Sequence, residues 1–260
     1  MRWHNWVNLK LAGGETADVG DIVRTIDVGY TAFGRLHRDD LLVNHIQPGD
    51  LIVGFASYGQ STYENSYNGG MGSNGLTSAR HDVFDHSYAG KYPASFDPSL
   101  PDDVVYVGSK KLTDTIDIDG QAIPVGKLVL SPTRTYLPVI KQLFEQLRPH
   151  LHGMIHCTGG GQTKVVKCIE NVKVIKDNFL PIPPLFELIQ QEAGTGWKEM
   201  YQVFNMGHRL EVYLPEAQAK DAIAIGKAFG IDAQIVGRVE AAPEATVEVH
   251  SPHGIFTYNE

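Results

Sequence analysis

The amino-acid sequence predicts an α+β protein in which helices pack on a mixed β-sheet. Segments with helical and strand periodicity alternate irregularly along the chain, which is typical of this class. Most of the 27 glycines lie between these segments, where they mark turns and ligand loops. No internal repeat is visible, and 260 residues suffice for one large domain or two small ones.

The first part of the chain contains strand signals and one long loop. Residues Thr25 to Phe33 alternate as a strand does, and the apolar run Leu51 to Ala56 follows a turn at Pro48 to Asp50. Residues Ser57 to Ser73 are rich in Gly, Tyr, Asn and Ser, and loops of this length are usually functional or mobile. We predict a helix over Leu76 to Phe84.

The middle of the chain contains a hairpin signal and a helix signal. Residues Tyr88 to Pro101 look irregular, and Asp119–Gly120 predicts a hairpin turn. Ser131 and Pro132 predict a helix start, with Ser as the N-cap and Pro in the first turn. The apolar stripe expected for this helix is Leu137, Ile140, Phe144 and Leu147.

Helices and strands also alternate in the last part of the chain. Helices are predicted over Gln162 to Ile169, after Pro183–Pro184 through Leu185, Leu188 and Ile189, over Trp197 to Phe204, and over Glu216 to Phe229. Strands are predicted over Leu151 to Ile155, Leu210 to Leu214, Ile235 to Val239 and Ala245 to Val249.

The run His156 to Lys164, which reads HCTGGGQTK, carries the clearest chemical signal. Three glycines between an apolar segment and a helix let a ligand approach the backbone closely. The helix start beyond them leaves N–H groups unpaired, with a partial positive charge that favours phosphate. The spacing matches neither the Walker pattern nor GxGxxG, so a tight turn at positive φ is the alternative.

Composition and charge exclude several classes of partner. The net charge is −8 and no basic stretch gathers Lys and Arg, which argues against nucleic acid and anionic membranes. The apolar runs are far shorter than a membrane span, and residues 1–8 lack the pattern of a secretory signal. Cys157 and Cys168 are too few for an extracellular disulfide framework, so we expect a reduced, cytoplasmic protein.

Six segments along the chain match a set of family motifs in the right order. They are GGETAD at 13–18, GDLIVGFAS at 49–57, SNG at 73–75 with Arg80, SPTRTY at 131–136, HCTGGG at 156–161 and EMYQVFNMG at 199–207. Together they resemble aminoimidazole ribonucleotide synthetase, the phosphoribosylformylglycinamidine cyclo-ligase of purine biosynthesis. The resemblance covers nearly the whole chain after Lys10, and it implies the fold of that family's C-terminal domain.

The resemblance implies ATP-dependent ring closure of formylglycinamidine ribonucleotide to aminoimidazole ribonucleotide, with Mg²⁺ bound between ATP phosphates and acidic side chains. It implies that His156 and Glu15 are catalytic and that Glu15 approaches the nucleotide metal. The residues implied to bind the substrate or its phosphate are Ser73, Asn74, Gly75, Thr158, Gly159, Gly160, Gly161 and Asn205. The partner implied is a phosphorylated small molecule, and the full-length enzyme is implied to be a homodimer.

Two features depart from the family pattern. The GGETA motif normally lies near the end of an amino-terminal ATP-binding domain, and here it begins at Gly13. We therefore expect residues 1–45 to be a remnant of that domain and residues 46–260 to be the complete C-terminal synthetase domain. Gly72 stands where the family usually has a histidine, after an inserted stretch from Gln60 to Met71. An apolar surface left exposed at Thr25 to Phe33 would favour self-association.

Other interpretations stay open on the sequence alone. The chain could be formylglycinamidine ribonucleotide synthetase or selenophosphate synthetase, which belong to the same superfamily, or a non-catalytic fragment that binds phosphorylated ligands. His156 could be a satisfied strand-end histidine, and Asn205 could simply turn the chain. A zinc site at His150, His152 and His156 is disfavoured, because these residues span too far for one ion without bending and no cysteine pair assists.

Overall fold

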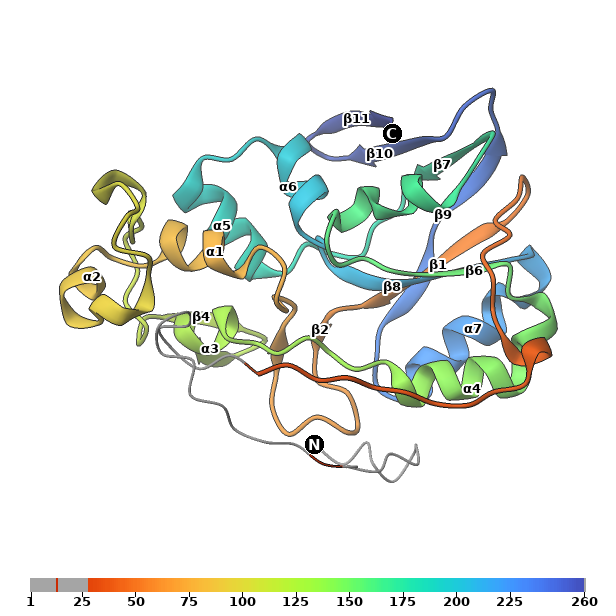
Figure 1. The fold of residues 1–260 in the computed structure, drawn as a ribbon, viewed down its shortest axis with the longest axis horizontal. Coiled ribbons are helices and arrows are strands. Elements are labelled where there is room, and N and C mark those ends of the chain that lie inside the picture. The colour runs from red at the N-terminus through yellow and green to blue at the C-terminus, as the bar shows by residue number, and fades with distance from the viewer. Residues whose placement is uncertain (1–12, 14–27, 260) are drawn as a thin grey trace.

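The computed structural model describes Gly13 and residues 28–259, and a seven-stranded sheet forms its centre (Figure 1). From edge to edge, the strands are β11 (Gly254–Asn259), β10 (Thr246–Ser251), β7 (Val172–Lys176), β9 (Ala233–Ala241), β1 (Leu51–Ala56), β8 (His208–Leu214) and β6 (Gly153–His156). Strands β10 and β7 run parallel, and the other neighbours are antiparallel. The predicted α+β class with a mixed sheet is confirmed.

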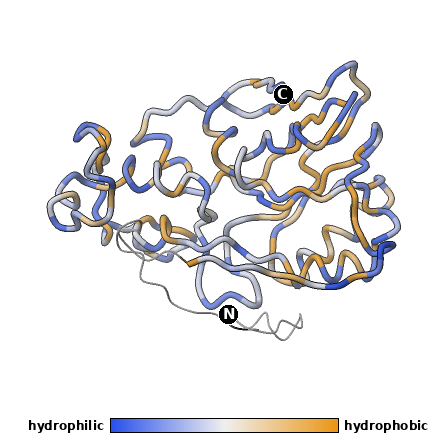
Figure 2. The backbone as a smooth tube through the Cα atoms, viewed as in Figure 1, coloured by the Kyte–Doolittle hydropathy of each residue, from blue (hydrophilic) through white to orange (hydrophobic). Residues whose placement is uncertain are grey.

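Both faces of the sheet are covered, because its central strand is apolar on both sides. Val53 and Phe55 of β1 pack in a cluster with α4 (Leu137–Leu147) and α7 (Glu216–Ala228). Ile52 points the other way, into a larger cluster with α1 (Leu76–Val83), α3 (Val125–Val129), α5 (Pro184–Ala193), α6 (Trp197–Val203) and the 3₁₀ helix η6 (Gly161–Cys168). Figure 2 shows that hydrophobic residues are concentrated in the sheet and in α4 and α7.

Shorter elements complete the described chain. They are β2 (Tyr58–Gly59), β3 (Asn68–Gly69), α2 (Ser87–Lys91), β4 (Thr115–Ile118), β5 (Gln121–Pro124), and the 3₁₀ turns η2 (Arg38–Asp40), η3 (Pro93–Ser95), η4 (Asp102–Val104) and η5 (Arg148–His150). The predicted hairpin is confirmed as β4–β5, and its turn places Asp119 and Gly120 at φ 52° and 80°. Among the described helices, none combines the length and apolar character that crossing a membrane requires.

Several predicted elements are confirmed within a residue or two, namely β1, α1, α5, α6, β8 and α7. Others are wrong. Residues 28–33 of the predicted strand at Thr25 to Phe33 form no regular structure, and the rest of that strand lies outside the described residues. The short helix α2 lies in the stretch predicted to be irregular. The helix predicted over Gln162 to Ile169 is confirmed in position, and it is a 3₁₀ helix over Gly161–Cys168.

The start of α4 differs from the prediction for a physical reason. Ser131 is not an N-cap, because residues 131–136 run past β1 before the helix begins at Leu137. Arg134 and Tyr136 both donate hydrogen bonds of 2.8 Å to the carbonyl of Ala56, which holds this segment against the end of β1. The buried stripe also differs by about one position and consists of Pro138, Val139, Leu143 and Leu147.

The segment before β1 is exposed and covers part of a sheet edge. The side chains of Val28, Tyr30 and Phe33 are 61%, 87% and 88% exposed. Farther along, the amide of His45 donates to the carbonyl of His152 at 2.6 Å, beside β6. Figure 1 shows this segment running along α4. The expected apolar surface is therefore present in the described part, and self-association through it stays a prediction.

A buried ion pair joins β7 and β8. Lys176 Nζ lies 2.5 Å from Glu211 Oε1, and both side chains are completely buried. His208 Nε2 lies 2.9 Å from the same oxygen, and Tyr213 donates to the other one at 2.8 Å. Burial acts to raise the pKa of Glu211, but the charge of Lys176 and the hydrogen bonds from His208 and Lys176 hold it at about 2.

The same lysine fixes the glycine-rich run on the sheet. Lys176 Nζ donates to the backbone carbonyl of Gln162 at 2.7 Å and to its side-chain oxygen at 3.0 Å. The Gln162 side-chain amide in turn donates to the carbonyls of Asn205 and His208. The ion pair therefore connects the first turn of η6 to the turn that precedes β8.

Removing one partner of this pair should be costly. We expect Lys176→Met to lower the free energy of unfolding by about 3–5 kcal/mol, because a carboxylate would be left buried without its counter-charge. Urea unfolding followed by tryptophan fluorescence measures this. Lys173→Met is the matched control on the same strand, since Lys173 pairs with Glu248 near the surface and should contribute less than about 1 kcal/mol. Equal stability of the two variants would contradict the assignment.

The pair should also shape the acid stability of the protein. The pKa of Glu211 falls from an ordinary 4.5 to about 2 in the folded chain. Its contribution is therefore complete above pH 4.5 and is lost as the pH falls toward 2. Unfolding free energies across this range should drop less steeply for Glu211→Gln than for the parent chain, and identical slopes would refute the expectation.

Candidate functional site

The two glycine-flanked loops meet on one surface. A Cβ atom built on Gly159 would lie 3.2 Å from the side-chain nitrogen of Asn74, and both residues are exposed. One loop leads into α1 through Gly75, and the other leads into η6 through Gly161. Segments far apart in the sequence therefore present their polar groups side by side.

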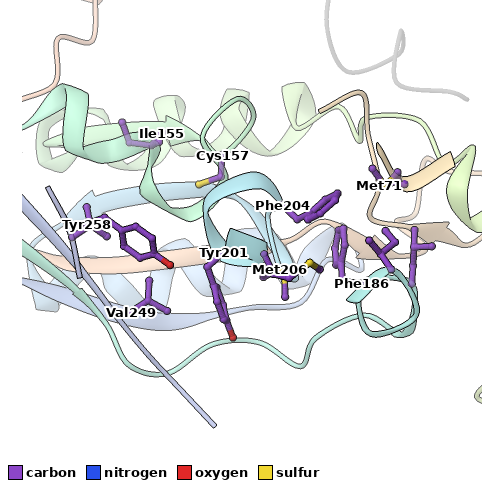
Figure 3. Close-up of a cluster of buried hydrophobic side chains, with 14 of the residues drawn as sticks. Met71, Ile155, Cys157, Phe186, Tyr201, Phe204, Met206, Val249 and Tyr258 are labelled. Atoms are coloured by element: carbon purple, nitrogen blue, oxygen red, sulfur yellow. The ribbon is translucent and has the colours of Figure 1, made fainter. Parts of the chain in front are cut away.

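A single aromatic residue supports both loops. Gly75 has φ 74° and Gly161 has φ 48°, in the left-handed region that favours glycine. A Cβ on Gly75 would lie 2.4 Å from the ring of Phe204, and one on Gly161 would lie 2.6 Å from its carbonyl oxygen. Figure 3 shows Phe204 in the buried cluster with Met71, Phe186 and Met206. No side chain fits at either glycine without moving this support.

Asn205 is buried, and its side-chain amide takes part in three hydrogen bonds. Ser57 donates to its side-chain oxygen at 2.6 Å, and its side-chain nitrogen donates to the carbonyl of Gly70 at 2.8 Å. The amide of Gly207 donates to the same oxygen at 3.2 Å. This geometry favours a positioning role, in which Asn205 holds the turn before Ser73.

The backbone of the second loop offers donors to a ligand. The N–H groups of Gly159 and Gly160 have no hydrogen-bond partner among the described residues. Lys164 Nζ donates to the carbonyl of Thr158 at 2.8 Å, which brings a positive charge over this loop. The sequence analysis did not single out Lys164, although it lies within the HCTGGGQTK run. Free amides beside a lysine form a setting that attracts an anion.

His156 ends β6 beside a cavity of about 510 Å³. The cavity is lined mainly by apolar groups: Thr133, Arg134, Thr135, Tyr136, Leu137, Ile140, Met154, His156 and Leu210. His156 keeps an exposed surface, yet desolvation by its surroundings, followed by the charges of Arg209 and Lys164, lowers its pKa to about 4. The imidazole is therefore neutral at pH 7, and it can accept a proton.

Arg209 occupies the space beside Gly72. Its side chain is 1% exposed, and Nη2 donates to the carbonyl of Gly70 at 2.5 Å. A Cβ on Gly72 would lie 2.6 Å from this nitrogen and 3.0 Å from the hydroxyl of Thr133. The guanidinium therefore excludes a side chain at the position where the motif led us to expect histidine. The sequence analysis missed Arg209, which lies two residues after the end of the motif at 199–207.

The remaining predicted site residues have mixed outcomes. Ser73 is exposed and Thr158 is half-buried, each at its own loop. Glu15, the predicted metal ligand, lies outside the described residues. Among residues 28–259, no three Asp, Glu, His or Cys side chains are placed to hold a metal ion. His152 of the considered zinc set instead pairs with Asp50, with 2.7 Å between Nδ1 and Oδ1.

Curated relatives share sequence along most of the chain. Phosphoribosylformylglycinamidine cyclo-ligases from Methanocaldococcus jannaschii and Methanopyrus kandleri are both 28% identical to it, over 255 and 242 residues. The matches cover 97% and 88% of this chain, but 63% and 57% of those proteins. The chain therefore spans less than two thirds of the length of these relatives.

Two solved structures match most of this chain. The T. maritima PurL complexed with FGAR matches 85% of this chain and 29% of its own, with a TM-score of 0.42 and 14% identity. The hydrogenase maturation protein HypE matches 82% of this chain and 53% of its own, with a TM-score of 0.41 and 16% identity.

The family model described as AIR synthase related protein, C-terminal domain, matches residues 47–250. This match includes five of the six motifs that suggested the resemblance, all except the one at 13–18. The chain belongs to the AIR synthase related family and contains its C-terminal domain.

Proposed function

We propose that this chain is the synthetase part of a phosphoribosylformylglycinamidine cyclo-ligase, which uses ATP to close the imidazole ring of aminoimidazole ribonucleotide. The names of the curated relatives and the order of the six motifs support the proposal. The observation that carries it is the meeting of Asn74 and Gly159, because one phosphorylated ligand can contact both loops only on a shared surface.

The proposal includes a division of the chain into two domains. Residues 46–260 would form the synthetase domain, and residues 1–45 would belong to a preceding ATP-binding domain. The family match beginning at residue 47 supports this boundary. The exposed apolar side chains of Val28, Tyr30 and Phe33 support an association surface before it, which fits a homodimer of the full-length enzyme.

Phosphate binding is assigned to the two loops. The free amides of Gly159 and Gly160 and the first turn of η6 would donate to phosphate oxygens, while Lys164 supplies positive charge. Ser73, Asn74 and Gly75 would close the site from the other loop, with Thr158 and Gly161 completing the second. Asn205 would act from below by holding the carbonyl of Gly70. These contacts orient a phosphorylated small molecule without a basic surface.

The reaction joins a phosphoryl transfer to a ring closure. ATP would phosphorylate the formyl amide oxygen of formylglycinamidine ribonucleotide, a nitrogen would attack the activated carbon, and phosphate would leave. His156, neutral at pH 7, would accept the proton that the attacking nitrogen releases. Mg²⁺ bound with ATP would neutralise phosphate charge. The described residues offer no metal-ligand set, and the candidate ligand Glu15 lies outside them.

The proposed location is the cytoplasm, where ATP and the phosphorylated substrate are available. Cys157 and Cys168 are both free thiols, which supports a reducing compartment.

A ring-closure assay tests the proposal directly. The purified full-length protein, given ATP and formylglycinamidine ribonucleotide, should produce aminoimidazole ribonucleotide, while substrates of the formylglycinamidine ribonucleotide and selenophosphate synthetases should not react. Calorimetric titration with formylglycinamidine ribonucleotide accompanies the assay. Binding without ATP hydrolysis would reject the cyclo-ligase and favour a non-catalytic binding fragment.

A methyl group on Gly159 should interfere with ligand binding specifically. We expect Gly159→Ala to raise the KM for the phosphorylated substrate about tenfold, or about 1.4 kcal/mol, because Asn74 would be displaced. Gly194→Ala is the matched control, since Gly194 has φ +65° against +60° for Gly159 and open space around it. Both variants should lose similar stability, about 1–2 kcal/mol. An equal KM in the two variants would show that Gly159 is not part of the binding site.

The pH dependence of kcat/KM should report the lowered pKa of His156. A base must be unprotonated, so kcat/KM should stay level as the pH falls from 8 to about 5 and decline only near pH 4. His156→Gln should lower kcat about 100-fold and remove this decline. Fluorescence at each pH confirms that the protein stays folded. A decline centred near pH 6.5 would show that His156 is not the titrating base.

A further inference from the structure

Arg209 is a buried cation whose hydrogen-bonding capacity is largely unused. Nη2 donates to the carbonyl of Gly70, but Nε and Nη1 have no partner among the described residues. The groups of the described chain that act on its charge are Tyr136, Arg134 and Cys157, and none of them is a carboxylate. Arginine does not lose its proton in proteins, so the charge cannot be removed by titration.

A second buried arginine shows how this fold satisfies such a group. Arg134 is also 1% exposed, and it donates to both carboxylate oxygens of Glu64 at 2.9 and 2.7 Å. It further donates to the carbonyls of Ala56, Tyr58 and Gly59. Burying a charge without such partners costs several kcal/mol. The contrast indicates that Arg209 is kept for a purpose other than holding the fold together.

The position of Arg209 connects it to both loops. Its carbonyl accepts a hydrogen bond of 2.6 Å from the amide of Cys157, which follows His156 at the start of the glycine run. Its guanidinium lies beside Gly72, immediately before Ser73. A Cβ built on Gly72 would lie 2.6 Å from Nη2 and 2.9 Å from Cζ, so a glycine at this position lets the backbone that leads into Ser73 approach the guanidinium closely.

We propose that Arg209 is an anion-binding residue, and that Nε and Nη1 donate to oxygens of a phosphate group held between the Ser73–Gly75 and Gly159–Gly161 loops. A planar guanidinium suits two-point contact with phosphate, and nearby glycine amides add donors from other directions. The identity of the ligand as a phosphorylated substrate rests on the proposed function. The proposal of a bound anion follows from the buried, positively charged guanidinium and does not depend on that function.

Phosphate titration of the full chain and its variants tests this. Inorganic phosphate at about 10 mM should raise the Tm of the parent chain, and calorimetry should detect the binding. Arg209→Met should abolish both effects. Arg148→Met is the matched control, because Arg148 also donates to one carbonyl, that of Leu41, and has a buried Nε without a partner, but lies in η5 away from the loops. The control should bind phosphate as the parent chain does.

The stability measured without phosphate separates binding from a structural role. Arg209→Met should be as stable as the parent chain or more stable, because an uncompensated buried charge is removed. A large loss of stability with an unchanged phosphate response would overturn the proposal and would assign Arg209 a structural role. A parent chain that does not bind phosphate would overturn it as well.

A second variant keeps the test decisive if Arg209→Met does not fold. Arg209→Lys retains the charge but loses the planar fork, and it should weaken phosphate binding about tenfold. Unchanged binding in Arg209→Lys would refute the two-point contact. Phosphate binding that depends on Arg209, in a full-length protein that shows no ring-closure activity, would keep this inference and reject the proposed function.

Discussion

The buried ion pair between Lys176 and Glu211 is the constraint on which the arrangement of the site depends. It sits where the sheet meets the glycine run, and Lys176 also binds the backbone and side chain of Gln162. Apolar packing alone would allow η6 to slide or rotate. The directional hydrogen bonds from the buried ammonium group of Lys176 fix the glycine run relative to β8. The Gln162 side chain then donates to the carbonyl of Asn205 and so holds that residue in place as well. The positions of the backbone amides in the glycine run therefore depend on a buried ion pair in the core.

The two buried arginines show a division between stability and binding. Arg134 uses its hydrogen-bonding groups inside the protein, holding the end of β1 and the long loop after it. Arg209 leaves Nε and Nη1 without a partner among the described residues. Natural sites often retain such unfavourable groups because a ligand completes them. In this molecule Arg134 is satisfied by protein groups, and we propose that a phosphate satisfies Arg209.

The elements predicted correctly from the sequence are those with strong local signals. The apolar run of β1 and the glycine-terminated helix α7 needed no tertiary information, and Gly230 at φ 68° ends that helix as expected. The start of α4 could not be predicted, because contacts with β1 hold residues 131–136 out of the helix. Strand β7, which reads VKVIK, was missed although three of its five residues are β-branched and apolar. The unpaired state of Arg209 depends on segments distant in sequence, so no local pattern could show it.

The central claim is that both glycine loops grip one phosphate over a frame set by the core. The most direct measurement is a crystal structure of the full chain with formylglycinamidine ribonucleotide. The account predicts its phosphate within hydrogen-bond distance of the amides of Gly159 and Gly160, with the side chain of Asn74 alongside. A phosphate bound on the α4–α7 face of the sheet, or ligand density confined to the apolar cavity beside Met154, would contradict it.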